Sequence, residues 1–227
     1  MRIDRVLSAL SIVLPCTVPI VEASAQGRSG FMNMTSIGRG FGMGDYVISA
    51  PRFYGEVEEP NDDIYWRFET INGAWLKEGV VSLGLGIGYE SYAGSKLGES
   101  PASNGSFGQL PLFLDVRLHP GNAPVTVFAM VQAGYSFGIN PFELPAVVVT
   151  SELVIPAQSV ELNGVQLAPG LGLLFRLSDD VAFHLSCLYD YHRFNYELIG
   201  ISSVGGYIPE TYAVQYGAVR IASGFVF

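Results

Sequence analysis

Three histidines are the residues most suited to chemistry, because imidazole serves both as a general base and as a metal ligand. They are His119, His184 and His192. His184 and Asp190 share one face of an extended chain, but the six residues between them span about 20 Å at ~3.3 Å per residue. They are therefore too far apart to form a catalytic pair. Cys187 falls on the opposite face from His184, so we predict no Cys–His metal site and no cofactor.

Three glycines spell a second candidate motif, G-x-G-x-G, at Gly84, Gly86 and Gly88. A phosphate-binding loop would need them at the start of a helix. Here they lie inside a stretch, 81–90, in which Val, Leu, Leu, Ile and Tyr alternate with small or polar residues. We interpret the glycines as small residues that make room for neighbouring arginines on the polar face.

Charged residues also recur on the polar face of such alternating stretches. Successive residues of a strand point to opposite sides, so Leu112 and Leu114 face one way while Asp115 and Arg117 face the other. The predicted inward set contains four guanidiniums and four carboxylates: Arg67, Arg117, Arg176 and Arg220 with Glu69, Glu90, Asp115 and Asp190.

Eight alternating blocks must position these residues. They cover roughly 29–40, 64–76, 80–92, 107–119, 124–137, 164–177, 181–195 and 213–227. The faces of the first two blocks stay open, because their alternation is poor. The connections alternate between long (41–63, 93–106, 138–163, 196–212) and short (77–79, 120–123, 178–180).

An even number of strands joined by alternating short and long connections is typical of a transmembrane β-barrel. A soluble sandwich has no reason to place all its long loops at one end. We therefore predict an all-β fold, a single eight-stranded antiparallel up-and-down barrel over residues 26–227, with both mature termini on the periplasmic side.

Composition agrees with a membrane setting and excludes two other classes. The 227 residues are 49% hydrophobic and only 15% charged, with a net charge of −9. Such hydrophobicity excludes a disordered chain, and 12 Lys and Arg against 21 Asp and Glu exclude a nucleic-acid binder. The predicted outer loops hold twelve acids but only Arg52 and Lys96 as bases.

The first segment predicts export. Arg2 and Arg5 precede an apolar stretch that ends at Ala23-Ser24-Ala25, a small-x-small cleavage pattern. We expect residues 1–25 to be a signal peptide cleaved between Ala25 and Gln26. The alternative, a retained anchor, needs about 20 uninterrupted apolar residues, whereas Pro15 and Pro19 interrupt this stretch.

The last block carries a family resemblance. Val219, Ile221, Phe225 and Phe227 share one face, with Ser223 as an exception, and the chain ends on the aromatic Phe227. In this the sequence resembles the small outer-membrane β-barrels of Gram-negative bacteria, of the outer-membrane protein A and W type. The resemblance implies a location in the bacterial outer membrane. It also implies contact with its lipid and lipopolysaccharide, and recognition of Phe227 by the barrel-assembly machinery.

Aromatic residues suggest the two girdles of such a barrel. We expect an inner girdle from Trp75, Phe225 and Phe227. The outer girdle is expected near the other ends of the strands, from Tyr89, Tyr92, Tyr135, Phe137, Tyr189 and Tyr191.

The inward charges admit two interpretations. They are either a charged constriction that selects solutes or a structural plug, because side chains can just fill an eight-stranded barrel. Equal numbers of each sign favour the plug. Our leading hypothesis is a structural or surface-interaction protein that acts through four long acidic outer loops. The alternatives are a narrow pore or conduit for small solutes, including apolar ones drawn to the apolar runs 145–149 and 153–156, and, less favoured, a lipid-modifying enzyme.

The enzyme alternative finds little support in the residues. Eight-stranded lipid A deacylases use a His and a Ser close together near a strand end. His192 is followed by Arg193, Phe194 and Asn195, so the serine is missing and the correspondence fails. We predict no enzyme activity.

Overall fold

The computed structural model describes residues 30–50, 55–77, 80–92, 107–121, 123–144, 147–150, 153–155, 157–201 and 207–227. The predicted signal peptide and its cleavage site at Ala25 and Gln26 lie outside this range. Over the described residues no helix is long and apolar enough to cross a membrane.

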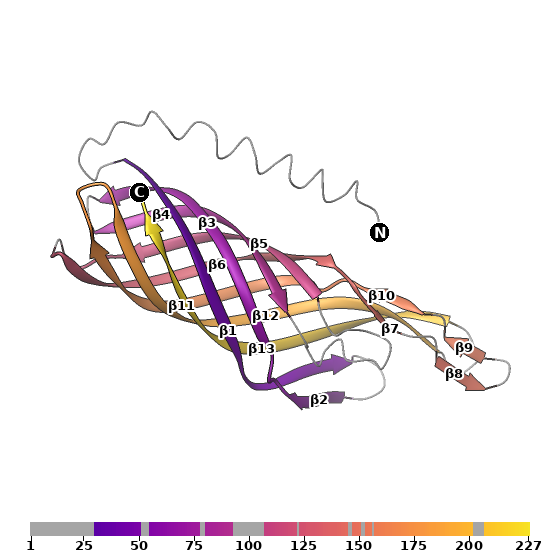
Figure 1. Ribbon diagram of the computed structural model, residues 1–227. Coiled ribbons are helices and arrows are strands. Elements are labelled where there is room, and N and C mark those ends of the chain that lie inside the picture. The colour runs from indigo at the N-terminus through magenta and orange to yellow at the C-terminus, as the bar shows by residue number, and fades with distance from the viewer. Residues whose placement is uncertain are drawn as a thin grey trace.

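Eight long strands form an antiparallel ring (Figure 1). In chain order they are β1 (Phe31–Ala50), β3 (Ile64–Lys77), β4 (Val81–Tyr92), β5 (Phe107–Leu118), β6 (Val125–Asn140), β11 (Asn163–Arg176), β12 (Ala182–Ile201) and β13 (Tyr207–Val226). Each pairs with the next, and β13 pairs back with β1 to close the ring. The eight-stranded antiparallel barrel predicted from the sequence is confirmed.

Four strands run further than the alternation predicted. β1, β6, β12 and β13 continue into the stretches expected to be outer loops. Those stretches also hold five short strands: β2 (Gly55–Pro60), β7 (Phe142–Leu144), β8 (Val147–Thr150), β9 (Leu153–Ile155) and β10 (Gln158–Val160). All five lie at one end of the barrel, opposite the short turns (Figure 1).

The strands are strongly tilted. Following directly paired residues once around the ring from Asn33 returns to β1 at Met43, ten residues further along. A stagger of this size requires the strands to tilt by roughly 35–45° from the barrel axis. Above Met43, β1 leaves β3 to pair with β2, and Gly44 takes a left-handed φ of 76° at this irregularity.

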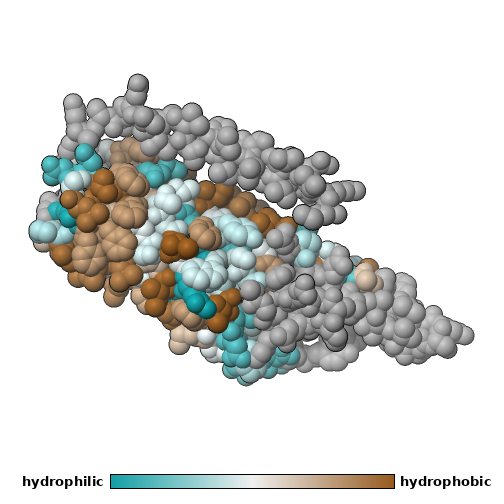
Figure 2. Space-filling view, viewed as in Figure 1, coloured by the Kyte–Doolittle hydropathy of each residue, from teal (hydrophilic) through white to brown (hydrophobic). Residues whose placement is uncertain are grey.

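Alternation sorts side chains to the two faces of the wall. Leu85 and Leu171 are 68% and 63% exposed, whereas Arg67, Arg117 and Arg220 are at most 1% exposed. The apolar residues cover the outside as a brown belt (Figure 2). The first two blocks, left open by the sequence, turn Met32, Met34 and Ser36 inward from β1 and Tyr65, Arg67 and Glu69 inward from β3.

Candidate functional site

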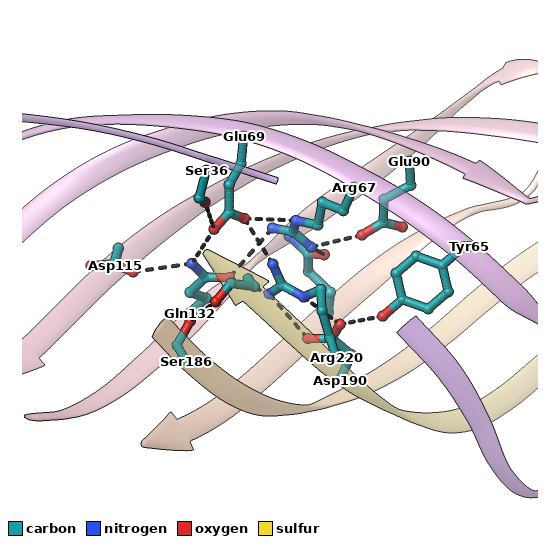
Figure 3. Close-up of polar contacts among 12 residues, drawn as sticks. Ser36, Tyr65, Arg67, Glu69, Glu90, Asp115, Gln132, Ser186, Asp190 and Arg220 are labelled. Atoms are coloured by element: carbon teal, nitrogen blue, oxygen red, sulfur yellow. Dashed lines mark hydrogen bonds and ion pairs between the residues drawn. The ribbon is translucent and has the colours of Figure 1, made fainter. Parts of the chain in front are cut away.

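The lumen holds a layer of charged and amide side chains at mid-height, most of which Figure 3 shows, and every wall strand supplies a member. The members, from β1 to β13, are Ser36, Arg67, Glu69, Glu90, Asp115, Arg117, Gln132, Gln166, Asp190 and Arg220, all buried. Several are direct cross-strand partners, such as Arg67 with Glu90 and Ser36 with Glu69. Strand pairing therefore sets these contacts.

Arg220 makes four hydrogen bonds within this layer. Its Nε and Nη2 donate to the two oxygens of Asp190 at 2.7 and 3.2 Å. Nη1 donates to Glu69 at 3.1 Å, and Nη2 also donates to the Gln132 carbonyl at 2.8 Å. This two-oxygen geometry is the strong form of an arginine–carboxylate contact. Arg220 thus ties the last strand to β3, β6 and β12.

Arg67, on β3, lies next to Arg220 in this layer, and both bind Glu69. Its Nε donates to Glu69 at 2.8 Å, and its Nη1 donates to Glu90 at 2.7 Å and to the Gln166 carbonyl at 3.0 Å. The guanidinium carbon also lies 4.7 Å from the centre of the Phe113 ring. Glu69 therefore accepts from both Arg67 and Arg220.

Arg117 pairs within its own strand, through Nε and Nη2 to Asp115 at 2.8 and 3.2 Å. Gln132 joins this pair to the others, because its Nε2 donates to Asp115 at 3.1 Å and to Glu69 at 3.3 Å. The three arginines therefore belong to one hydrogen-bonded network.

The network has three guanidiniums and four carboxylates, and neutral donors supplement the charges. Ser36 donates to Glu69 at 3.0 Å, Tyr92 donates to Glu90 at 3.0 Å, and the Tyr65 hydroxyl donates to Asp190. Buried charges need such pairing, because isolated ones are very unfavourable in a dry interior.

Arg176 is a correction to the predicted network. It has the predicted parity but ends β11 beside the short turns, where it is half-buried and its Nη2 donates to the Gly121 carbonyl at 3.3 Å. The other seven predicted charges lie in the central layer. Parity specifies the face of a residue but not its depth, and Arg176 lies at the rim beside the short turns.

The glycines of β4 make room for apolar side chains rather than for arginines. A Cβ at Gly86 would lie 2.3 Å from the Phe113 ring, and one at Gly84 would lie 2.5 Å from Ile71. Phe113 in turn supports Arg67. Gly86 therefore affects Arg67 only indirectly, through the position of Phe113.

Apolar clusters flank the charges on both sides along the lumen. Toward the short turns, a cluster includes Met32, Met34, Phe128, Leu174 and Val226. Toward the outer end, a second cluster includes Tyr46, Phe107, Leu162, Phe194 and Val214. Three tyrosines, Tyr65, Tyr92 and Tyr216, join the second cluster to the charges, and the hydroxyls of Tyr92 and Tyr216 lie 2.7 Å apart.

The three histidines are dispersed among these layers. His119 contacts Trp75 and Phe128, with ring centres 4.9 and 5.2 Å away, and His184 contacts the edge of Phe128. His192 stacks on Tyr216 at 4.8 Å. Among the described residues, no group of three or more His, Cys, Asp or Glu side chains is placed to hold a metal ion.

Two members of the predicted girdles point inward instead. Tyr92 is fully buried and stacks on Phe107 with ring centres 4.3 Å apart. Trp75 packs against the inner apolar cluster and His119. Trp75 belongs to the second block, whose poor alternation leaves its face open. Tyr92 shares the parity of Glu90, so the sequence did contain a signal that its side chain points inward. Exposed girdle residues missed by the sequence reading are Phe31, Phe41, Trp66 and Phe68.

The fold and the apolar outer surface are those of an integral outer-membrane β-barrel. No protein-family model matches this chain, and no curated protein sequence does. Among solved structures, the outer membrane protein OprG from Pseudomonas aeruginosa is similar over 89% of this chain and 98% of its own, with 13% identity and a TM-score of 0.53.

Two further solved structures match at lower scores. A major outer membrane protein from Thermus thermophilus covers 86% of this chain and 98% of its own, at 13% identity and a TM-score of 0.47. The outer membrane protease OmpT from Escherichia coli covers 91% and 99%, at 7% identity and 0.44. At these identities the likeness concerns the fold alone.

Proposed function

We propose that this chain is an outer-membrane structural or surface-interaction protein whose lumen does not conduct. The observation that carries the proposal is the layered interior. A network of seven buried charges lies between two apolar clusters. An ion would have to displace paired side chains to cross it, and breaking such buried pairs is strongly unfavourable.

The outer end supplies the interaction surface. Exposed acids gather where β1 and β2 rise above the belt, at Asp45, Glu56, Glu58, Glu59 and Asp62. Asp63 is an exception, because it is buried and accepts from the Tyr46 hydroxyl. Potential of one sign attracts partners of the opposite sign, so the proposed partner presents a basic surface.

The paired extensions of β12 and β13 form a stem at this end. Tyr196 and Tyr212 stack with ring centres 5.3 Å apart. Burial, with a smaller contribution from Tyr212, raises the pKa of Tyr196 to about 12. The hydroxyl is neutral at physiological pH, as an ordinary tyrosine hydroxyl is, so the negative charge of this end comes from its carboxylates.

Planar-bilayer recording of the refolded protein tests the closed lumen. We expect no steady conductance. Steady, ion-selective steps would overturn the proposal and favour the alternative of a narrow pore. A conduit for small apolar solutes would instead be indicated by uptake of an apolar dye into proteoliposomes without ion conductance.

Binding of a cationic peptide to proteoliposomes tests the outer surface. Changing Glu56, Glu58 and Glu59 to Gln should weaken binding several-fold, and the effect should vanish at high salt. The control changes Asp179 and Asp180 to Asn, because these exposed acids lie in a short turn at the other end. Equal weakening by both variants would contradict the proposal.

Assembly is part of the same proposal: export with cleavage after Ala25, followed by recognition of Phe227 by the barrel-assembly machinery. Phe227 is exposed, and its backbone exchanges two hydrogen bonds with Asn33, at 2.8 and 3.1 Å. Intact-mass analysis should find Gln26 as the first residue. Phe227→Ala should lower the amount of heat-modifiable barrel, and unchanged levels would contradict the role.

A further inference from the structure

On the lipid-facing surface between the girdles, polar side chains occur over only one part of the barrel's circumference. On β4, β5, β6, β11 and β12 the outward positions between the girdles are all apolar or aromatic, or Cys187: they run from Val81 to Tyr89, Leu110 to Leu118, Val125 to Phe137, Val165 to Phe175 and Phe183 to Tyr191. On β1, β3 and β13 the pattern breaks at Arg39, which lies beside Phe41 and Trp66, and nearer the short turns at Asn33, Thr35, Thr70, Asn72 and Ser223. We name the last five residues the polar patch.

The polar patch lies at membrane depth. On β1 the outward row runs from Phe31 to Phe41, ten residues that rise roughly 24 Å along a tilted strand, close to the ~25 Å apolar band of such barrels. Thr35 is four residues into that row, and Thr70 is midway between Leu76 and Ile64 on β3. Figure 2 shows the result as a pale and teal band through the brown belt along β1.

The patch residues form two rows across β1 and β3. Asn33 is the direct partner of Asn72, and its Nδ2 donates to the Asn72 carbonyl at 2.8 Å. Thr35 is the direct partner of Thr70, with their hydroxyl oxygens 3.5 Å apart. Two amides carry four N–H donors and four acceptor positions, and this bond uses one of each. Hydrocarbon offers nothing to the rest.

We propose that the polar patch is the contact face of a dimer formed with a second copy of this chain. Two copies in one membrane are related by a two-fold axis along the membrane normal, and such an axis brings equal depths together. The amide row then meets an amide row, and the hydroxyl row meets a hydroxyl row. Asn and Thr both donate and accept, so each row is complementary to itself.

The surroundings of the patch suit close approach. Thr35, Thr70 and Ser223 are small, and larger apolar side chains, Ile37 and Phe68, border the rows toward the outer end. Polar side chains that hydrogen-bond across a lipid-embedded interface, together with small residues, are what holds membrane segments together. A lipid chain has no group that replaces these bonds.

Cysteine cross-linking in native outer membranes tests the dimer, in a Cys187→Ser background. Thr35→Cys should oxidise to a disulfide-linked homodimer at least ten times faster than Val131→Cys. Val131 is the matched control, because it faces lipid at similar depth on β6, the strand opposite β1 in the ring. Equal rates, or a cross-linked product that contains a different protein, would overturn the proposal.

A second variant separates the contact from folding. Asn33→Leu with Asn72→Leu places apolar groups toward lipid, so the barrel should assemble and keep its heat-dependent gel mobility. In that background the Thr35→Cys cross-link should fall to the Val131→Cys rate. An unchanged rate would refute the dimer face, and failure to assemble would show that the amides serve the barrel itself, which also refutes it.

Discussion

Two arginines occupy neighbouring positions in the wall and have opposite surroundings. Arg220 faces the lumen from β13, and Arg39 faces outward from β1, one position away from the residue paired with Arg220. Arg220 is fully buried and contacts two carboxylates and one amide. Arg39 is exposed, and its guanidinium carbon lies 5.2 Å from the Trp66 ring centre and 5.4 Å from that of Phe41.

The comparison shows that the surroundings of a charged side chain depend on which face of the barrel wall it occupies, because the wall is only one strand thick. Inside, Arg220 is fully buried and paired with Glu69 and Asp190. Outside, Arg39 lies near the outer girdle, where its stem covers aromatic surface and its head reaches the interface. We therefore expect the same residue type to stabilise the barrel on one face and to contribute little to its stability on the other.

The largest expected effect is that of Arg220→Leu. It removes the cation from Asp190 and leaves Glu69 with Arg67 alone. Losing one partner of a buried pair costs about 3–5 kcal/mol. Urea unfolding in lipid vesicles should report a loss of this size, whereas a loss below about 1 kcal/mol would indicate a water-filled lumen.

Tyr65→Phe should have the next largest effect. The change keeps the ring, which stacks on Tyr92 with centres 4.8 Å apart, and removes only the hydroxyl that donates to Asp190. Hydrogen bonds to charged groups contribute about 1.5–3 kcal/mol. The same unfolding measurement should find a loss in this range, and an unchanged midpoint would mean that Arg220 alone satisfies Asp190.

Arg39→Leu should change stability little. An outward arginine near an interface costs about 0–1 kcal/mol relative to an apolar residue, and the lost cation–π contacts offset that by a similar amount. We expect an unfolding free energy within about 1 kcal/mol of the parent. A loss of unfolding free energy as large as that of Arg220→Leu would contradict the expected difference between an inward and an outward arginine.

Cys187 gives a probe of the faces that leaves stability unchanged. The side chain is exposed on the outer surface of β12, between Leu185 and Tyr189. A small apolar maleimide should label it in intact membranes, and a charged, impermeant one should not. Equal labelling by both reagents would place β12 out of register by one residue, because such a slip exchanges its faces.

Alternation predicted the barrel and the direction of most charges because the period of a strand is two. It succeeded on β5, where Leu and Val mark one face without interruption, and on β12, where Phe, Leu, Cys and Tyr mark the outward face. It left β1 and β3 open, because Asn33, Thr35 and Arg39 stand where apolar residues were expected. Their outward direction follows from closure of the ring, which pairing with β13 imposes.

The partners of the charges were harder to predict than their faces. Gln132 and Tyr65 share the parity of inward residues on their strands but carry no charge, so nothing in the sequence marked them. Depth was the other missing quantity, as Arg176 shows. Depth depends on the stagger between strands, which is a property of the whole ring rather than of any one block.

The contact between Arg220 and Glu69 has a consequence for how the barrel forms. The two residues are 151 positions apart and come from the last strand and the second strand of the ring. In an open sheet they lie near opposite edges, so their pairing requires the edges to meet. The contact between Glu69 and Arg220 therefore forms only when the ring closes, and it adds to the Glu69–Arg67 pair in favouring the closed ring over a partly zipped sheet.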